Sequence, residues 1–165
     1  MGYADDLFDL TDRVVLVTGG SRGLGREMAF AAARCGADVI IASRKYDACV
    51  ATADEIAAET GRTASPYQVH VGRWDELDGL VDAVDDRFGR LDVLVNNAGM
   101  SPVYDKLTDV SEKLFDAVIN LNLKGPFRFR FTTASNSFSE TVLNDSYSGD
   151  IPALLTSTST RPKRS

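Results

Sequence analysis

The sequence predicts an α/β fold, a doubly wound parallel sheet of about four strands with an irregular C-terminal tail. Three observations predict it. Short β-branched and leucine-rich runs alternate with helical patterns through the first 131 residues. A glycine-rich turn follows the first run directly, which is typical of a buried parallel strand entering a helix. Beyond residue 131 the pattern stops, and 14 of the last 34 residues are serine or threonine.

The strands are predicted from four apolar runs that are too short for helices. The first run is Val14 to Val17, and an unbroken run of this kind is expected for a strand that is covered on both faces. Each run is separated from the next by a helical pattern, so the strands are expected to be parallel with right-handed crossovers. The predicted strands are residues 13–18, 38–42, 66–71 and 91–95.

The helices are predicted from apolar residues that recur every three or four positions. The first three helices stop at glycines, which commonly end helices. Gly36, Gly61 and Gly89 hold these places. The predicted helices are residues 23–35, 46–60, about 77–88, and from about 110 to 121 or beyond, and the apolar stripe of the first one consists of Leu24, Met28, Ala32 and Cys35.

Length and composition narrow the range of possible functions. The 165 residues suit one domain, which we place at residues 1–131, with 132–165 as a Ser/Thr-rich tail that is too polar to fold alone. The net charge of −6 argues against a nucleic-acid protein. Cys35 and Cys49 form no metal-ligand spacing, and no metal is expected. No secretion signal or membrane-spanning run of about 18 apolar residues is present, so we expect a cytoplasmic protein without a membrane partner.

The glycine-rich turn predicts a phosphate site. Gly19, Gly23 and Gly25 let the backbone turn sharply and approach a pyrophosphate without an intervening Cβ. The helix that follows offers free N–H groups and the positive end of its dipole to the anion. An ordinary tight turn is the alternative, but a strand precedes this turn and a helix follows it.

Three motifs together resemble the short-chain dehydrogenase/reductase family. The run Thr18 to Gly25 matches that family's T-G-x-x-x-G-x-G turn, and Asn96 to Gly99 matches its N-N-A-G motif. Residues 121–125 match the helix segment that carries the family's catalytic asparagine, here Asn122. The resemblance covers about four-fifths of the chain but only the first half of the family's fold. It implies a Rossmann-like, NAD(P)-binding domain with strand order 3-2-1-4 and an oxidoreductase function.

The charge pattern after the second predicted strand favours NADP(H) over NAD(H). An acidic residue there would bind the adenosine ribose and repel a 2′-phosphate. This sequence has Ser43, Arg44 and Lys45 instead, and Arg22 lies in the glycine turn. Guanidinium groups form charge-assisted hydrogen bonds with phosphate. The alternative is that Arg44 and Lys45 are a solvated entry to the next helix.

The resemblance also implies the remaining cofactor contacts. His70 and Val71 stand where the family contacts the adenine, although His70 is equally compatible with a partly exposed loop position. The residues assigned to the pyrophosphate and ribose are Gly19, Ser21, Arg22, Gly23, Leu24 and Gly25, those assigned to the 2′-phosphate are Ser43 and Arg44, and those assigned to the nicotinamide half are Asn97, Ala98 and Gly99.

The resemblance implies interconversion of a small-molecule carbonyl and an alcohol, but the catalytic set is incomplete. The family's proton donor is a tyrosine followed four residues later by a lysine, and none of the five tyrosines here has that partner. Asn122 is therefore the one catalytic residue assigned, with Ser157 as a weak candidate for the family's serine. The substrate is not predicted, because the missing half of the fold shapes it.

Three hypotheses follow from the incomplete catalytic set. The first is a truncated or frame-shifted reductase, which we expect to be inactive. The second is a non-enzymatic dinucleotide-binding module or fragment, and the third is an enzyme that uses another acid. The resemblance implies a homo-oligomer, which is in doubt for this chain. The fourth strand (Val93 to Val95) would lack its outer neighbour, and this open edge would invite association.

Overall fold

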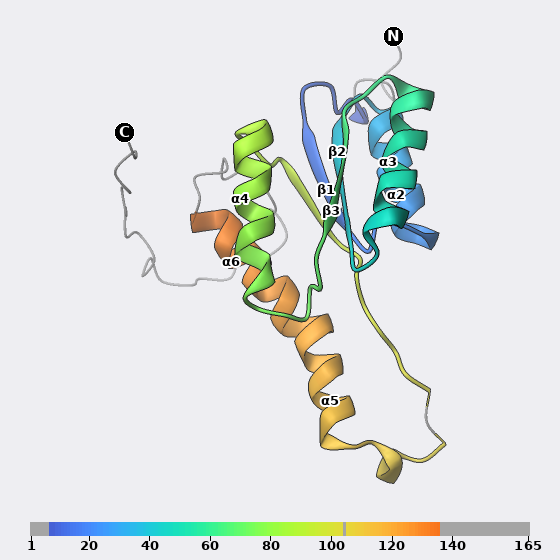
Figure 1. Ribbon diagram of the computed structural model, residues 1–165, viewed down its shortest axis with the longest axis vertical. Helices are drawn as coiled ribbons and strands as arrows, with labels where there is room; N and C mark the ends of the chain where they lie inside the picture. Colours follow the sequence, from blue (N-terminus) through green and yellow to red (C-terminus); the bar gives the residue numbers. More distant parts are fainter. Residues whose placement is uncertain (1–6, 104, 136–165) are drawn as a thin grey trace.

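The computed structural model of the chain describes residues 7–103 and 105–135. Four parallel strands form one sheet in the order β3-β2-β1-β4, which confirms the predicted order (Figure 1). The strands pair in register at their carboxyl ends, with Thr18 opposite both Ala42 and Asn96. The strands are β1 (Val14–Thr18), β2 (Asp38–Ser43), β3 (Ala64–Gln68) and β4 (Val93–Asn96).

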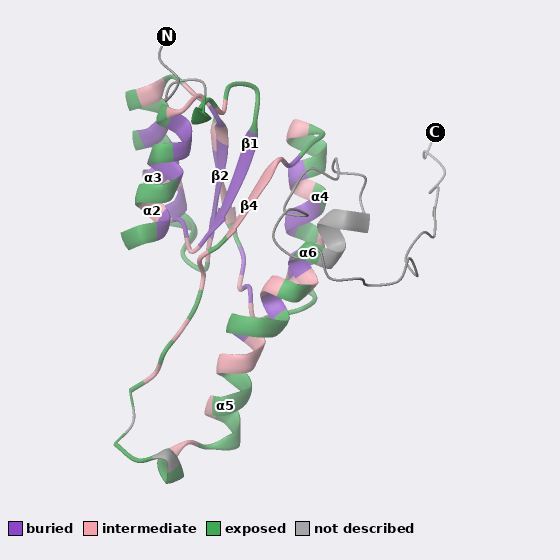
Figure 2. Cartoon of the chain, turned by 180° about the vertical axis from the view of Figure 1, so that it is seen from behind, coloured by how far each residue is buried: buried purple, intermediate pink, exposed green. Residues whose placement is uncertain are grey.

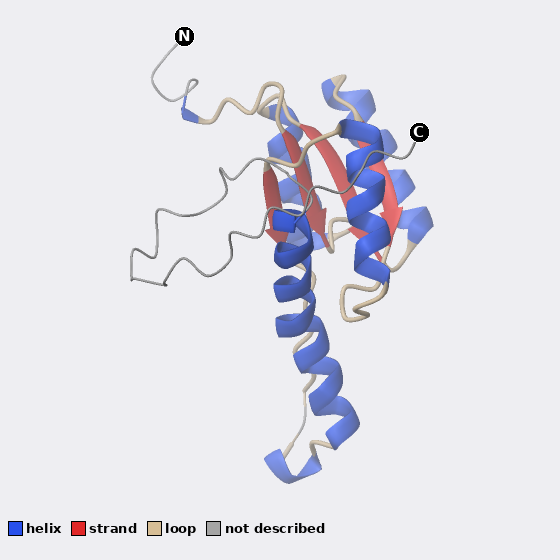
Figure 3. Ribbon diagram, turned by 90° about the vertical axis from the view of Figure 1, so that its left-hand side faces the viewer, coloured by secondary structure: helices blue, strands red, loops and turns tan. Residues whose placement is uncertain are grey.

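Helices cover both faces of the sheet, as in a doubly wound fold. Two helices lie on one face and α4 lies on the other with α6 beside it (Figure 1). The last three helical segments form one long rod that leaves the sheet (Figure 3). The helical segments are α2 (Gly23–Arg34), α3 (Tyr46–Thr60), α4 (Glu76–Phe88), the 3-10 turn η1 (Leu107–Asp109), α5 (Glu112–Ile119), the π-helical η2 (Asn120–Lys124) and α6 (Gly125–Ser135).

The strands divide their side chains between two apolar clusters. Alternate residues of β1 point to opposite faces, so Leu16 joins the cluster under α4 and α6 while Val15 and Val17 join the cluster under α2 and α3. Figure 2 shows β1 and β2 buried and β4 only partly buried. Within the described residues β4 ends the sheet, so its outer edge is open, as the sequence predicted.

Two strand predictions need correction. The third strand is Ala64–Gln68, which begins two residues and ends three residues earlier than predicted, because those residues pair with Val39 to Ser43. Val69 and Val71 lie beyond the end of the strand and are buried in the core. Their apolar character therefore reflects burial and not pairing with a neighbouring strand. Proline is tolerated in β3 because β3 is an edge strand. The fourth strand begins at Val93, two residues later than predicted.

The predicted apolar stripe of the first helix is wrong at its start. Leu24 is 75% exposed and Met28 is 43% exposed, whereas Ala29, Ala32 and Ala33 are buried. The buried face of α2 consists of Phe30 and small residues, which let the helix pack closely on the sheet, whereas Leu24 and Met28 lie outside it.

The last predicted helix is longer and less regular than expected. α5 begins after Ser111, whose hydroxyl accepts a hydrogen bond from the Leu114 N–H at 3.2 Å and caps the helix. The helix passes through η2 into α6, which extends four residues past the predicted domain boundary at 131. Phe115 on α5 is 57% exposed, so it lacks the packing that an apolar helix face usually finds.

The remaining predictions for the tail lie outside the described residues. They include the candidate Ser157. In the part of the chain that the structure describes, no helix has both the length and the apolar character needed to cross a membrane.

Candidate functional site

The glycine-rich turn joins the carboxyl end of β1 to the first turn of α2. The Gly19 N–H donates to the Ala42 carbonyl on β2 at 2.7 Å, which fixes the turn to the neighbouring strand. Gly23 adopts φ +56°, and a Cβ on it would meet no atom within 4 Å. Arg22 precedes the helix in an extended conformation, and its side chain does not cap the helix. An uncapped helix N-terminus that faces open space is suited to bind an anion.

Gly25 has a packing role that the sequence analysis did not identify. A Cβ on Gly25 would lie 2.5 Å from the Gly19 carbonyl oxygen and closer still to the Asn97 side-chain nitrogen. Real side chains do not approach each other so closely, so glycine is needed where α2 packs against its own turn. Gly25 therefore has a packing role, whereas Gly23 faces the open space, and the predicted approach of Gly25 to a ligand stays a prediction.

Asn97 and Thr18 hold the turn against β4. The Asn97 side-chain amide donates to the carbonyls of Thr18 and Gly19 at 3.0 and 3.2 Å. The buried Thr18 hydroxyl accepts from the N–H groups of Asn97 and Ala98, both at 3.1 Å, and lies 3.1 Å from the Val95 carbonyl. These bonds occupy the side chain of Asn97, so it organises the site, and the small residues Ala98 and Gly99 continue past it.

The loop after β2 carries the predicted 2′-phosphate residues. The side chain of Arg44 is exposed, and no carboxylate occurs between Ser43 and Lys45. The Ser43 hydroxyl accepts from the Lys45 N–H at 3.3 Å and lies 3.1 Å from the buried Cys49 sulfur. The hydroxyl of Ser43 is thus engaged within the loop, whereas the Arg44 side chain extends into solvent.

The two predicted arginines belong to the same edge of the sheet. Arg22 follows β1 and Arg44 follows β2, and these strands are parallel neighbours whose carboxyl ends pair in register. The hydrogen bond from Gly19 to Ala42 joins the two loops. Both side chains are exposed, so this edge of the sheet carries two positively charged residues.

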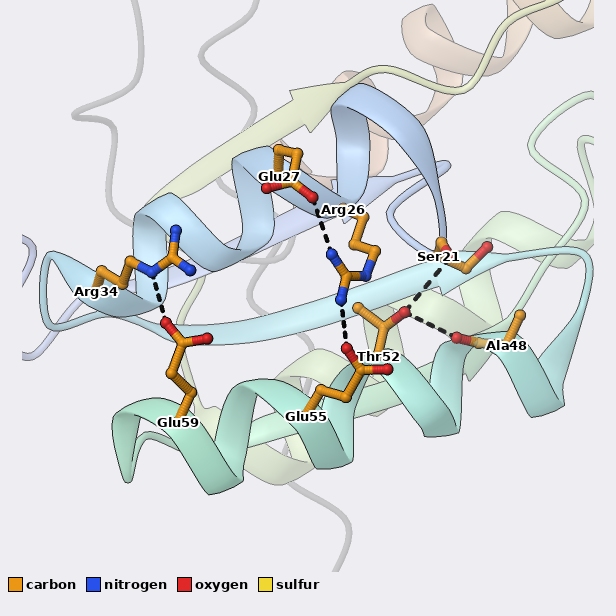
Figure 4. Close-up of polar contacts among 8 residues, drawn as sticks. All are labelled: Ser21, Arg26, Glu27, Arg34, Ala48, Thr52, Glu55 and Glu59. Atoms are coloured by element: carbon orange, nitrogen blue, oxygen red, sulfur yellow. Dashed lines mark hydrogen bonds and ion pairs between the residues drawn. The ribbon is translucent and has the colours of Figure 1, made fainter.

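Polar contacts also join α2 to α3 along one side of the site (Figure 4). The buried Thr52 hydroxyl lies 2.9 Å from the Ala48 carbonyl and 3.4 Å from the Ser21 carbonyl, so α3 contacts the turn directly. Farther along, two arginines of α2 pair with glutamates of α3. The pairs are Arg26 with Glu55, and Arg34 with Glu59 at 2.7 Å.

An open groove at the edge of β3 adjoins the Arg44 loop, and Arg44, Gln68 and His70 help to line it. The His70 ring accepts a hydrogen bond at Nδ1 from the Gly72 N–H at 3.1 Å, which leaves Nε2 for another partner. The His70 N–H donates to Glu76 at 2.7 Å. Hydrogen bonds from the Arg73 side chain and from this N–H hold the pKa of Glu76 below its usual value.

Val71 faces away from this groove. Its side chain is buried in the apolar core. A ligand in the groove would therefore contact the backbone of Val71 and not its side chain. Leu24, which the sequence assigned to the pyrophosphate, is exposed beside the glycine turn.

Asn122 lies in the π-helical segment η2 and fixes the loop after β4. Its side-chain oxygen accepts from the Met100 N–H at 2.9 Å, and its side-chain nitrogen donates to the Met100 carbonyl at 2.8 Å. π-helical segments are frequent at functional sites because they reposition side chains. Here the segment brings Asn122 next to Gly99.

The sequence did not identify two contributors to this site, namely Thr52 and Gln68, and it marked Thr18 only as the first residue of the glycine motif. Thr52 and Gln68 are common polar residues whose roles depend on partners distant in sequence, so no local pattern marks them. The described part of the chain contains no group of three or more side chains placed to hold a metal ion.

Comparison with known proteins supports the same interpretation. Residues 13–146 match the protein family described as short chain dehydrogenase. The chain is 38% identical over 130 residues to galactitol 2-dehydrogenase of Agrobacterium fabrum, which covers 77% of this chain and 47% of that protein. The chain spans about half the length of the curated relatives it matches.

Solved structures give the same fold. A metagenomic short-chain oxidoreductase in complex with NADP is 32% identical, with a TM-score of 0.73, and the match covers 77% of this chain and 57% of that one. A short chain dehydrogenase from Burkholderia cenocepacia in complex with NADP is 36% identical, with a TM-score of 0.72, and the match covers 76% of this chain and 51% of that one.

Proposed function

The chain belongs to the short-chain dehydrogenase/reductase family, and we propose that the carboxyl edge of its sheet binds NADP(H) in preference to NAD(H). The observation that carries the proposal is the cradle at the start of α2. There Gly23 has a positive φ and open space beside it, at a helix N-terminus without a side-chain cap. The cradle therefore fits a pyrophosphate, which needs backbone N–H donors and no Cβ in its path.

Charge supports the choice of NADP(H). The loop after β2 has no carboxylate to repel a 2′-phosphate, and Arg44 is exposed there. Arg22 lies in the neighbouring turn and is also exposed, so two arginines belong to the edge where the adenosine ribose would lie. Relatives of known structure that hold NADP give independent support.

The other end of the site would receive the nicotinamide half. Ala98 and Gly99 offer little bulk there, and Asn97 and Asn122 hold the adjoining backbone in place. A bound nicotinamide would supply or accept a hydride. The residues of this chain would bind and orient the dinucleotide, which requires the fixed backbone that these hydrogen bonds provide.

For the whole protein we propose NADP(H)-dependent interconversion of a carbonyl and an alcohol. The 165 residues hold the nucleotide-binding elements and Asn122, but no tyrosine in them is followed four residues later by a lysine. These residues therefore lack the tyrosine and lysine that would supply general-acid catalysis. We therefore expect them to bind the dinucleotide without turning over a carbonyl substrate.

A fluorescence titration tests binding, and a turnover assay tests activity. The chain should enhance and shift the emission of NADPH with saturation, and should bind NADH more weakly. Incubation with NADPH and a panel of ketones and quinones should leave NADPH absorbance unchanged. Absence of saturable NADPH binding by a folded chain would refute the first proposal, and steady NADPH consumption would refute the second.

A further inference from the structure

We infer that Gln68 is a positioning residue that directs Arg44 toward the 2′-phosphate, an inference that rests on the proposed NADP(H) site. Gln68 is the last residue of β3 and stands opposite Ser43, the last residue of β2. Its side-chain nitrogen lies 3.2 Å from the Arg44 carbonyl oxygen. Because a carbonyl can only accept, the amide nitrogen must be the atom that faces it.

The start of the loop is held by contacts to Ser43. The Val69 N–H donates to the Ser43 carbonyl at 2.9 Å and extends the pairing of β2 with β3 by one step. On the inner side, the Cys49 sulfur lies 3.1 Å from the Ser43 hydroxyl and 3.6 Å from the Tyr67 carbonyl. The end of β3 thus forms the support of the loop.

Arg44 depends on Gln68 because of where this bond acts. Among the hydrogen bonds described for the loop, the bond from Gln68 is the one that reaches the Arg44 carbonyl. It fixes the peptide group that follows the Arg44 Cα, and the direction of the Cβ follows from the backbone. An arginine side chain loses much rotamer freedom on binding, so a fixed starting point lowers the cost of reaching a phosphate.

Charge and location support a positioning role. Gln68 carries no charge, so it offers a 2′-phosphate no ionic attraction, whereas Arg44 beside it offers a planar fork of donors. Both residues line the groove at the edge of β3. Gln68 is exposed, so its replacement removes little packing, and its effect on binding can be separated from an effect on folding.

The test uses the 165-residue chain with Gln68→Ala and with Gln68→Met, which keeps the length of the side chain but not its donor. Dissociation constants for NADPH and NADH are measured by fluorescence titration, and circular dichroism monitors folding. One neutral hydrogen bond corresponds to about a fivefold change in a dissociation constant. We expect NADPH binding to weaken by about fivefold in both variants, and NADH binding to change by less than about twofold.

A double-mutant cycle with Arg44→Ala decides how Gln68 acts. If Gln68 acts through Arg44, Gln68→Ala will have no further effect on NADPH binding in the Arg44→Ala background. An equal effect in both backgrounds would identify Gln68 as a direct ligand and overturn the inference. Equal weakening of NADPH and NADH, or loss of folding in both Gln68 variants, would also overturn it. Failure of the unaltered chain to bind NADPH would refute the proposed function, whereas normal NADPH binding by the Gln68 variants would refute this inference alone.

Discussion

Replacement of Gly25 by alanine probes the packing that shapes the cradle. The new Cβ would lie 2.5 Å from the Gly19 carbonyl oxygen and would collide with the Asn97 amide. Overpacking of this kind costs about 1–3 kcal/mol, and loss of a hydrogen bond from Asn97 adds about 1 kcal/mol. The gain in helix propensity from glycine to alanine returns about 1 kcal/mol. We therefore expect the free energy of unfolding to fall by about 2 kcal/mol.

Gly79→Ala is the matched control, because it makes the same change inside α4. There the new Cβ would have one tight contact, with the Tyr67 hydroxyl at 3.3 Å, and that side chain is free to shift slightly. Urea denaturation should show Gly25→Ala destabilised and Gly79→Ala within about 1 kcal/mol of the unaltered chain. For a chain of this size, 2 kcal/mol lowers the melting temperature by about 4–8 °C. Equal stability of the two variants would refute the packing role of Gly25.

Three further predictions concern charge and the edge of the sheet. Arg44→Ala should weaken NADPH binding at least about tenfold and leave NADH binding within about twofold in fluorescence titrations, since a charge-assisted bond is lost; equal weakening would contradict the assignment. Burial alone would raise the pKa of Asp92, but hydrogen bonds from Arg90, a backbone N–H and Arg13 outweigh it and hold that pKa below its usual value. Asp92 therefore contributes stability above its unfolded pKa that is lost as the pH falls through its lower folded pKa. Asp92→Asn should cost roughly 2 kcal/mol in urea denaturation at pH 7, and the difference should shrink below about pH 4; a constant difference would argue against the ionised role. The open edge of β4 should cause concentration-dependent association in sedimentation velocity, and a monomer with a reversible melt would contradict this.

Local signals in the sequence were sufficient for the framework of the site. The valine-rich run before the glycines, the alternation of strands and helices, and the glycine spacing predicted β1 and α2, and the family resemblance implied the strand order. The N-N-A-G motif and Asn122 were located by family resemblance, and the structure places Asn97 against the glycine turn and Asn122 against Met100. These features are contiguous in sequence, so their geometry follows from local backbone preferences.

Other features depend on contacts between distant segments and were not predictable from local patterns. Leu24 and Met28 were predicted as core residues from their size, but the buried face of α2 consists of Phe30 and small residues. Val69 and Val71 resembled strand residues because they are buried beyond the end of β3. Gln68 contacts Arg44 only because β2 and β3 pair in parallel and in register.

The central claim is that the cradle holds a dinucleotide whose 2′-phosphate lies between Arg22 and Arg44. Phosphorus NMR of bound NADP⁺ tests this most directly, because it reports the protonation of the 2′-phosphate itself. Two guanidinium groups favour the dianion, so the pKa of the bound 2′-phosphate should fall below its free value of about 6. A bound 2′-phosphate that titrates as in free NADP⁺ would contradict the account.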